Sequence, residues 1–586
     1  MGLISELRRR NVLRMVVLYA VAAWLIMQVA EVIIGLANLP EWIGPTILGL
    51  LAVGFPIALI FSWFYELTPE GISLEKDVAA AESIMHVTSR RMDFIVISLL
   101  CAAVILFTYD KWWIGPPPEQ SIAVLPFVNM SNDPDNEYFS DGISEELLNV
   151  LAKIEDFRVT GRTSSFSFKG KDTDIQTIGE KLHVQTILEG SVRKAGDQVR
   201  ITAQLVNVED GYRLWSETYD RNLNNIFEVQ DEIAIAVVSA LRLELPTRPA
   251  PSGRTGGVDP TAYRHYLQGR FLAHGSTAEE IDLGLAHLRE TSRLDPSFAP
   301  AYAAIADAMI VKAFFSTSHT AEIVGEARTA AQSAIALNPD LAEAYAALAS
   351  IRMFFDFDWP GSEDAFRKAI SLGPTSSTPY YRYANLLTGL ARFDEAVRMA
   401  ERAVEIDPIA IGALHAFGLA KLFGGDFEGA VAAFGNAIEV RPDWTWGYVK
   451  KSLAHALIGQ DTEALSLAEQ TEKLTGGWGS AFLQGWLAWV YSVTEQDELL
   501  QRVAERINQG IEDNRIEDPF GVAVTYLAIG ELSMALDWTE RTVNERSPNA
   551  VFWSVGTADH LKLAPAAFRE SPRFIELLRR MDLPEH

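Results

Sequence analysis

Proline recurs at a nearly constant interval in the carboxy-terminal half of this 586-residue chain. Successive intervals of 35, 34 and 34 residues separate Pro339, Pro374, Pro408 and Pro442. Because proline cannot continue a hydrogen-bonded helical turn, each one is expected to end a helix. Pro296 stands 43 residues before Pro339, which predicts an insertion near residues 314–320. The chain is therefore expected to stack one helical unit many times instead of folding around a single core.

Small residues follow the same period. Alanine recurs at 34-residue spacing in two series: Ala369, Ala403 and Ala437, and Ala396, Ala430 and Ala464. Small side chains at fixed places let two antiparallel helices approach closely, and a 34-residue period is typical of the tetratricopeptide repeat. Residues 411–442 form the most complete unit. Residues 259–586 thus resemble an α-solenoid of tetratricopeptide repeats, with a looser register after Gly476.

A solenoid of this kind presents a concave groove lined by the first helix of each pair. The repeat register places nine residues there: Tyr381, Asn385, Thr388, His415, Leu419, Phe423, Trp446, Val449 and Leu453. We expect this largely apolar groove to bind a protein partner. The alternative is that its aromatic residues only pack the helix pairs, because aromatic side chains serve both cores and interfaces.

Three apolar stretches precede the repeats, at about residues 15–36, 43–65 and 92–113. A helix needs about 20 residues to cross a bilayer, so each stretch is long enough to span. Arg8, Arg9, Arg10 and Arg14 precede the first stretch, and Lys76, Arg90 and Arg91 lie between the second and the third, whereas residues 37–42 contain no Lys or Arg. The positive-inside rule then places the amino terminus in the cytoplasm. Residues 1–115 are expected to be an all-α anchor in the inner membrane, and later residues to be periplasmic.

Two polar features of the predicted anchor have competing interpretations. Gln28 and Glu31 lie on one face of the first predicted span, where they either pack against a neighbouring helix or handle an ion or proton. The pair Arg9-Arg10 belongs to a run that loosely resembles a twin-arginine export signal. The two further apolar stretches favour a topology-setting role for these charges.

Residues 119–245 have a different pattern, and a Pro/Gly-rich linker, residues 246–258, follows them. One run buries every second residue if it forms a strand: Val199, Ile201, Ala203 and Leu205. A similar run precedes it across a turn at residues 195–197, which predicts a hairpin. Helices are predicted at about residues 141–154, 174–182 and 226–241, with Ser140 or Asp141 capping the first. We expect a small α/β domain with a mixed sheet.

This domain resembles the TolB amino-terminal/FlgO-like family. The resemblance is carried by segments 122–127 and 199–205, Gly190-Ser191-Val192, Leu214-Trp215-Ser216, Tyr219-Asp220 and Phe227-x-x-Gln230-Asp231-x-Ile233. It implies an envelope-facing domain of a Gram-negative bacterium. Larger relatives carry a cyclase or winged-helix domain on the cytoplasmic side, and the predicted cytoplasmic segments of this chain are too short for either. The resemblance therefore implies no enzyme activity.

Composition excludes several classes of function. The formal net charge is −27, which disfavours a nucleic-acid partner. The single cysteine, Cys101, excludes an intrachain disulfide or a cysteine-ligated zinc site. The acidic loop at residues 133–137, with Asp141, lacks the spacing of a calcium-binding hand and is interpreted as solvated. The sequence contains none of the common phosphate-binding, metalloprotease or serine-nucleophile motifs. We expect no catalytic residue, cofactor or metal site.

These features predict a multidomain protein with a transmembrane anchor, a small α/β domain and an α-solenoid. The expected function is that of a non-catalytic scaffold that holds a protein partner at the periplasmic face of the lipid bilayer through the repeats. The alternative is a transmembrane signalling or regulatory subunit that couples periplasmic binding to a separate cytoplasmic output protein. Self-association into a homo-oligomer is compatible with either function.

Overall fold

The computed structural model of the chain describes residues 121–131, 133, 136–152, 157–196, 198–222, 226–241, 259–273, 278–314 and 320–584. It also describes Tyr19, Ala23, Leu51, residues 54–56, and the strands β1 (Tyr65–Thr68) and β2 (Gly71–Leu74). The chain forms two compact units, Met1–Glu119 and Gln120–His586.

In the first unit, β1 and β2 pair as an antiparallel hairpin, with Tyr65 opposite Leu74. The Tyr19 hydroxyl donates a hydrogen bond of 2.7 Å to the carbonyl of Leu51. Within the described residues, no helix combines the length and the apolar character that a membrane crossing requires. Most of the three predicted spans, together with Gln28, Glu31 and the basic residues that flank the spans, lies outside the described residues, as does the predicted linker at residues 246–258.

The second unit begins with a mixed sheet. Its strands are β3 (Ser121–Val124), β4 (Val128–Asn129), β5 (Arg158–Val159), β6 (Thr186–Ala195), β7 (Gln198–Asn207) and β8 (Arg213–Asn222). The order is β5-β3-β6-β7-β8, and β4 pairs with β6. Strand β3 runs parallel to both neighbours, whereas β6, β7 and β8 form an antiparallel meander. The predicted α/β domain with a mixed sheet is therefore confirmed.

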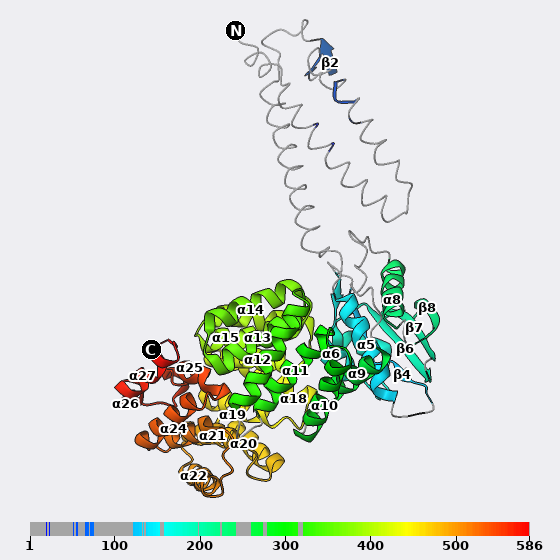
Figure 1. Ribbon diagram of the computed structural model, residues 1–586. Coiled ribbons are helices and arrows are strands. Elements are labelled where there is room, and N and C mark those ends of the chain that lie inside the picture. Colours follow the sequence, from blue (N-terminus) through cyan, green and yellow to red (C-terminus); the bar gives the residue numbers. More distant parts are fainter. Residues whose placement is uncertain are drawn as a thin grey trace. The chain divides into compact units, whose positions relative to one another are not determined.

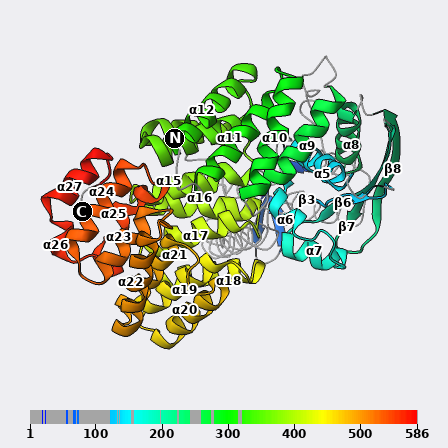
Figure 2. The same cartoon turned by 60° about the horizontal axis from the view of Figure 1, so that its bottom comes forward.

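Alternation along the strands sends side chains to two different cores. Ile122 and Val124 face α5 (Glu137–Leu151) and α8 (Ile226–Ala240), which cover one side of the sheet. Ala123 points the other way, into a smaller cluster under α7 (Ile175–Leu182). Figure 2 shows these helices on opposite sides of the strands. The period of two along a strand explains the separation, because successive side chains leave opposite faces.

Helical pairs follow the sheet domain, coloured from green to red along the chain in Figure 1. The pairs are α9 (Pro260–Ala273) with α10 (Ala278–Leu294), α11 (Ala299–Phe314) with α12 (Thr320–Leu337), α13 (Ala342–Ile351) with α14 (Trp359–Leu372), α15 (Ser377–Gly389) with α16 (Phe393–Ile406), α17 (Ile411–Phe423) with α18 (Phe427–Val440), α19 (Thr445–Leu457) with α20 (Asp461–Thr475), α21 (Ala481–Val493) with α22 (Asp497–Glu512), and α23 (Pro519–Ala528) with α24 (Leu532–Asn544). The predicted helical repeats are therefore confirmed.

Short helices complete the carboxy terminus. They are η5 (Pro548–Phe552), α25 (Trp553–Gly556), η6 (Asp559–Leu561), α26 (Ala566–Arg569) and α27 (Pro572–Arg580). Their apolar residues belong to one continuous core that extends from Ala349 to Leu583. The chain end is thus packed into the array.

The first helix of the sheet domain begins earlier than predicted. Helix α5 starts at Glu137, after Asn136, so Ser140 and Asp141 lie inside it and neither caps it. Asp141 is buried and pairs with Lys169 at 2.6 Å. Burial raises the pKa of Asp141 against the opposing effect of Lys169. The prediction was wrong because a local capping signal was assigned to a residue that makes a tertiary ion pair.

Candidate functional site on the concave face of the repeats

The nine predicted groove residues lie on α15, α17 and α19. Five of them are buried: Thr388, Leu419, Phe423, Val449 and Leu453. Tyr381, Asn385 and His415 are half-buried, and Trp446 is 37 % exposed. The register of the repeats does bring several of these side chains together, but in this structure five of them are core residues. Their role in binding a partner stays a prediction.

The chain's own carboxy-terminal segment covers this face. The Ser554 hydroxyl donates to the carbonyl of Gly389 at 3.0 Å. Phe552 stacks on Phe423 with ring centroids 5.7 Å apart. His560 Nε2 lies 2.8 Å from the carbonyl oxygen of Phe423. Residues near the end of the chain thus occupy a surface at which a tetratricopeptide array can bind a peptide.

A cavity of about 40 Å³ remains beneath this cover. It is lined by His415, Leu419, Phe423, Trp446, Lys450, Phe482, Trp486, Trp489, Phe520, Val524, Asn549, Phe552, Trp553, Gly556 and Leu563. Four of the nine predicted residues are among them. The lining is mostly aromatic and contains no carboxylate. An apolar lining with a few polar groups is the composition of small-molecule sites, although this cavity is much smaller than the roughly 300–1,000 Å³ that such sites usually have.

Lys450 is the charged residue of this lining, and it is only 2 % exposed. Its ammonium lies 5.0 Å from the ring centre of Trp446 and 5.2 Å from that of Trp486, which are cation–π distances. Its Nζ lies 2.5 Å from His415 Nε2 and can donate to it. Burial lowers the pKa of Lys450 to about 7. Burial, and then the charge of Lys450, hold the pKa of His415 well below its usual range.

Two tryptophans that line the cavity have indole donors without a partner in the part of the chain that the structure describes. Trp486 Nε1 and Trp553 Nε1 are buried, and neither has a hydrogen-bond partner among the described residues. Trp489, in contrast, donates through Nε1 to the carbonyl of Leu561 at 2.9 Å. Buried polar groups are nearly always satisfied, so two orphaned donors in one lining call for an acceptor.

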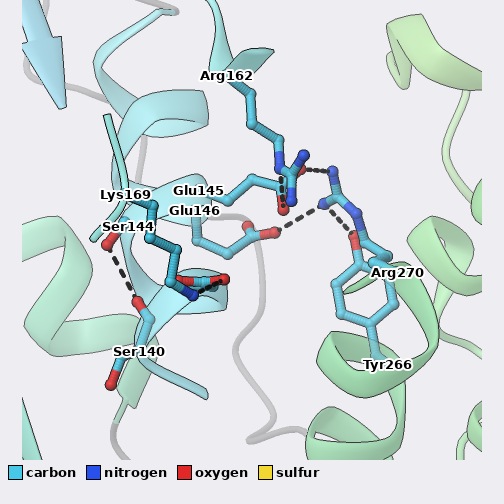
Figure 3. A network of polar contacts seen from close by, with 9 residues as sticks. Ser140, Ser144, Glu145, Glu146, Arg162, Lys169, Tyr266 and Arg270 are labelled. Carbon is cyan, nitrogen blue, oxygen red and sulfur yellow. Dashed lines mark hydrogen bonds and ion pairs between the residues drawn. The ribbon is translucent and has the colours of Figure 1, made fainter. Parts of the chain in front are cut away.

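A polar network joins the sheet domain to the first repeat helix (Figure 3). Arg270 of α9 forms ion pairs with Glu145 and with Glu146 of α5, the latter at 3.3 Å, and donates to the Tyr266 hydroxyl at 2.8 Å. Arg162 forms an ion pair with the other oxygen of Glu145 at 3.0 Å. Glu145 is buried. Since a buried carboxylate needs charged partners, the network fixes α9 on α5.

A second junction lies further along the array. The Asp407 carboxylate, 2 % exposed, accepts from the backbone N–H of Ser164 at the start of α6 (Arg162–Phe166). The Ser164 hydroxyl accepts from the N–H of Ile409 at 2.9 Å, and the Gly161 N–H donates to the carbonyl of Ile406. Burial raises the pKa of Asp407 to about 6, although the hydrogen bonds from Ser164 lower it.

Comparison with known families gives two matches. Residues 118–236 match the second domain of HilA/YgeH-like transcriptional regulators. Residues 377–409 match the tetratricopeptide repeat. The expected resemblance to the TolB amino-terminal/FlgO-like family is therefore wrong. The segments that suggested it lie mainly in the strands of a small mixed sheet and in helix α8, elements that unrelated α/β domains share.

One relative is "Putative adenylate cyclase 3" of Rhizobium meliloti (strain 1021), which is 40 % identical over 195 residues. The match covers 32 % of this chain, and the chain spans about a third (33 %) of that relative. Similar solved structures include PilF of Pseudomonas aeruginosa, with 16 % identity, a TM-score of 0.29 and coverage of 35 % of this chain and 91 % of PilF. A tetratricopeptide protein of Parabacteroides merdae has 12 % identity, a TM-score of 0.34 and coverage of 46 % and 100 %. These structural likenesses carry no functional argument.

The expected function of a periplasmic scaffold is contradicted by these matches. The segment that was expected to be an envelope-facing domain is similar instead to a domain of transcriptional regulators. The relative with 40 % identity is named as a putative adenylate cyclase and not as a scaffold. Both findings favour the regulatory alternative.

Lys450, Trp486 and Trp553 were missed by reasoning from the sequence. Lys450 lies in the helix between the predicted Trp446 and Leu453, and a lysine on an otherwise apolar face was the available signal. Trp486 and Trp553 lie beyond Gly476, where the repeat register no longer predicts which face a residue occupies.

Proposed function

We propose that this chain is a signalling or regulatory protein. In this proposal the α/β domain and the repeats act as one input module, and a binding event on the repeats is passed to a separate output protein. One observation carries the proposal: the sheet domain and the first repeats share a single hydrophobic core, from Ile122 to Phe355. A spacer that merely held the repeats away from an anchor would need no such core.

The two polar junctions support the same proposal. Arg270 ties α9 to α5, and Asp407 ties the turn after α16 to α6. Displacing the repeats relative to the sheet would therefore separate buried charges from their partners, which costs several kcal/mol. Rigid coupling of this kind lets two sites influence each other, provided that the coupled elements have two arrangements.

The comparisons support a regulatory role more than a mechanical one. The matching family is named for transcriptional regulators, and the relative for an adenylate cyclase. Because the chain spans only a third of that relative, cyclase activity is not assigned to it. We propose that this chain is not an enzyme and that the output is a separate protein. The repeats would bind a protein, as tetratricopeptide arrays do.

The experiment is complementation of a deletion strain. We expect deletion to change either the cyclic-nucleotide level or the transcript profile of the cell, and the wild-type chain to restore it. A variant that weakens both junctions, Arg270→Met with Asp407→Ala, should fail to restore the output even when its expression is raised until its cellular level equals that of the wild type, since its loss of stability lowers its abundance. The exposed-pair variant Arg289→Met is the matched control and should restore it. Unchanged transcripts and nucleotide levels after deletion would overturn the proposal.

We also propose that residues 1–115 anchor the chain in the inner membrane, with the rest periplasmic. This proposal is supported by the apolar stretches and the asymmetry of basic residues. Alkaline phosphatase fused after residue 258 should be active if the second unit is periplasmic. Activity only of a cytoplasmic reporter at the same site would reverse the topology.

A further inference from the structure

The side chains that line the cavity beneath the carboxy-terminal segment carry more hydrogen-bond donors than acceptors. Lys450 Nζ, Trp486 Nε1 and Trp553 Nε1 are buried donors, and the two indoles have no partner among the described residues. Among the side chains that line it, His415 Nε2 accepts from Lys450, and no carboxylate offsets the ammonium. A buried ammonium without an anionic partner and two unsatisfied donors are each unfavourable. An acceptor that carries negative charge would offset the ammonium and could satisfy an indole donor.

The walls and the size of the cavity restrict that acceptor. Aromatic rings form most of the lining: Phe423, Trp446, Phe482, Trp486, Trp489, Phe520, Phe552 and Trp553. Such walls accommodate an apolar group and offer little to replace the water shell of a doubly charged anion. A water molecule occupies about 10–15 Å³ by the same measure, so a cavity of about 40 Å³ holds roughly three or four non-hydrogen atoms.

We propose that this cavity binds a small monocarboxylate of the size of formate or acetate. One carboxylate oxygen accepts from Lys450 Nζ, and the other accepts from an indole Nε1. The methyl group of acetate packs against the aromatic walls. Charge-assisted hydrogen bonds of this type are the stronger ones in proteins, and apolar surroundings strengthen them further.

The cover makes this site part of the closed array. Phe552, Trp553 and Leu563 belong to the carboxy-terminal segment, whereas His415 and Lys450 belong to the repeats. A bound carboxylate would therefore bridge the two and hold the segment in place, since a ligand that binds only the closed form stabilises it. This inference is independent of the proposed regulatory function.

The experiment uses the full chain, purified in a non-ionic detergent, with sodium acetate as the probe. Tryptophan fluorescence is followed while acetate replaces chloride at constant ionic strength. We expect a saturable change, because Trp446, Trp486 and Trp553 line the cavity. Sodium phosphate, larger and partly doubly charged, should give no saturation in the same range.

Two variants distinguish the site from a general salt effect. Lys450→Met removes the ammonium but keeps the stem, and should weaken acetate binding at least tenfold. Lys451→Met removes the neighbouring lysine, which does not line the cavity, and should bind as the wild type does. A Trp486→Phe variant, which lacks the indole donor, should fall between them. Saturation transfer from protein aromatic protons to the acetate methyl group provides a second readout.

Two results would overturn the inference that the cavity binds a monocarboxylate. No saturable response of the wild-type chain to acetate or formate would do so. Equal acetate affinity in the wild type and in Lys450→Met would also do so, provided that both chains have the same circular dichroism spectrum. Loss of signalling in cells would leave this result unaffected, so the two proposals fail separately.

Discussion

Asp407, in the turn after a repeat helix, accepts a hydrogen bond of 3.0 Å from the backbone N–H of Ser164, 243 residues earlier in the chain. The carboxylate thus satisfies a donor at the amino-terminal end of α6 in another domain, a role that the residue immediately before a helix usually fulfils. Gly161 makes this possible, because a Cβ there would lie 2.3 Å from Asp407 Oδ2.

Asp407 predicts a pH dependence of stability. Its pKa in the folded chain is about 6, above the value of about 3.9 in an unfolded chain. The folded state therefore binds the proton more tightly, and this residue's contribution to stability falls as pH rises from about 4 to 6. At pH 7 the penalty amounts to about 3 kcal/mol. Asp407→Asn should remove it, as chemical denaturation at several pH values would measure; an identical pH slope in both chains would contradict this assignment.

Gly142 predicts a packing defect. A Cβ at this position in α5 would lie 2.5 Å from Leu267 Cδ2 of α9. Gly142→Ala should therefore destabilise the unit by about 1–2 kcal/mol, although alanine favours a helix. Gly325→Ala is the matched control, because nothing lies within 4 Å of its Cβ and it is also helical. That change should stabilise by about 0.5–1 kcal/mol. Thermal unfolding measures both, and equal signs would be inconsistent with so close an approach of α5 and α9.

A third prediction concerns the loss of stability when Arg270, the partner of buried Glu145, is removed. Arg270→Met leaves Glu145 buried with less compensation and should cost about 3–5 kcal/mol in the free energy of unfolding. The double variant with Glu145→Gln should recover much of the loss, because no uncompensated charge remains. The exposed pair Arg289–Glu326, at 48 % and 47 % exposure, is the control. Removing Arg289 should cost less than about 1 kcal/mol. A failure of the double variant to recover would mean that packing dominates.

A fourth prediction concerns the contribution of Trp359 to the stability of the carboxy-terminal helices. Its indole Nε1 donates to the carbonyl of Met581 at 2.7 Å in a buried setting. Trp359→Phe leaves that carbonyl unsatisfied, so we expect a loss of about 1–3 kcal/mol. Hydrogen exchange should accelerate in α27 more than in α16. Uniform acceleration through the array would indicate that the end is not a separate element of stability.

The regular parts of this fold could be predicted from the sequence because they repeat short-range rules. Val199, Ile201, Ala203 and Leu205 are all buried on one face of β7, as their spacing predicts. The paired helices likewise follow from the spacing of proline and alanine. Small residues allow the two helices of a pair to approach closely. At Gly418, for example, a Cβ would collide with Phe434 of the partner helix.

The covered concave face could not be predicted in this way. Trp359 and Met581 are 222 residues apart, and no periodic signal connects them. The repeat register identified the first helices of the central pairs, yet it could not say that the end of the chain would fold onto them. The expected family was wrong for a related reason. Alternation along a strand predicts a sheet, but it does not distinguish the many families whose domains contain one. The cavity around Lys450 depends on the same long-range contacts, since Phe552, Trp553 and Leu563 line it.

Closure of the array by its own end changes how such a protein should unfold. An open solenoid contacts only neighbouring repeats, so its ends fray and its stability grows almost additively with repeat number. Here the bond from Trp359 to Met581 links an early pair to the terminus. Non-local contacts of this kind slow folding, because a long loop must close before the contacts form. Insertion or deletion of a central repeat would move the carboxy-terminal helices away from the residues that they contact. We therefore expect the number of central repeats in this chain to tolerate little change.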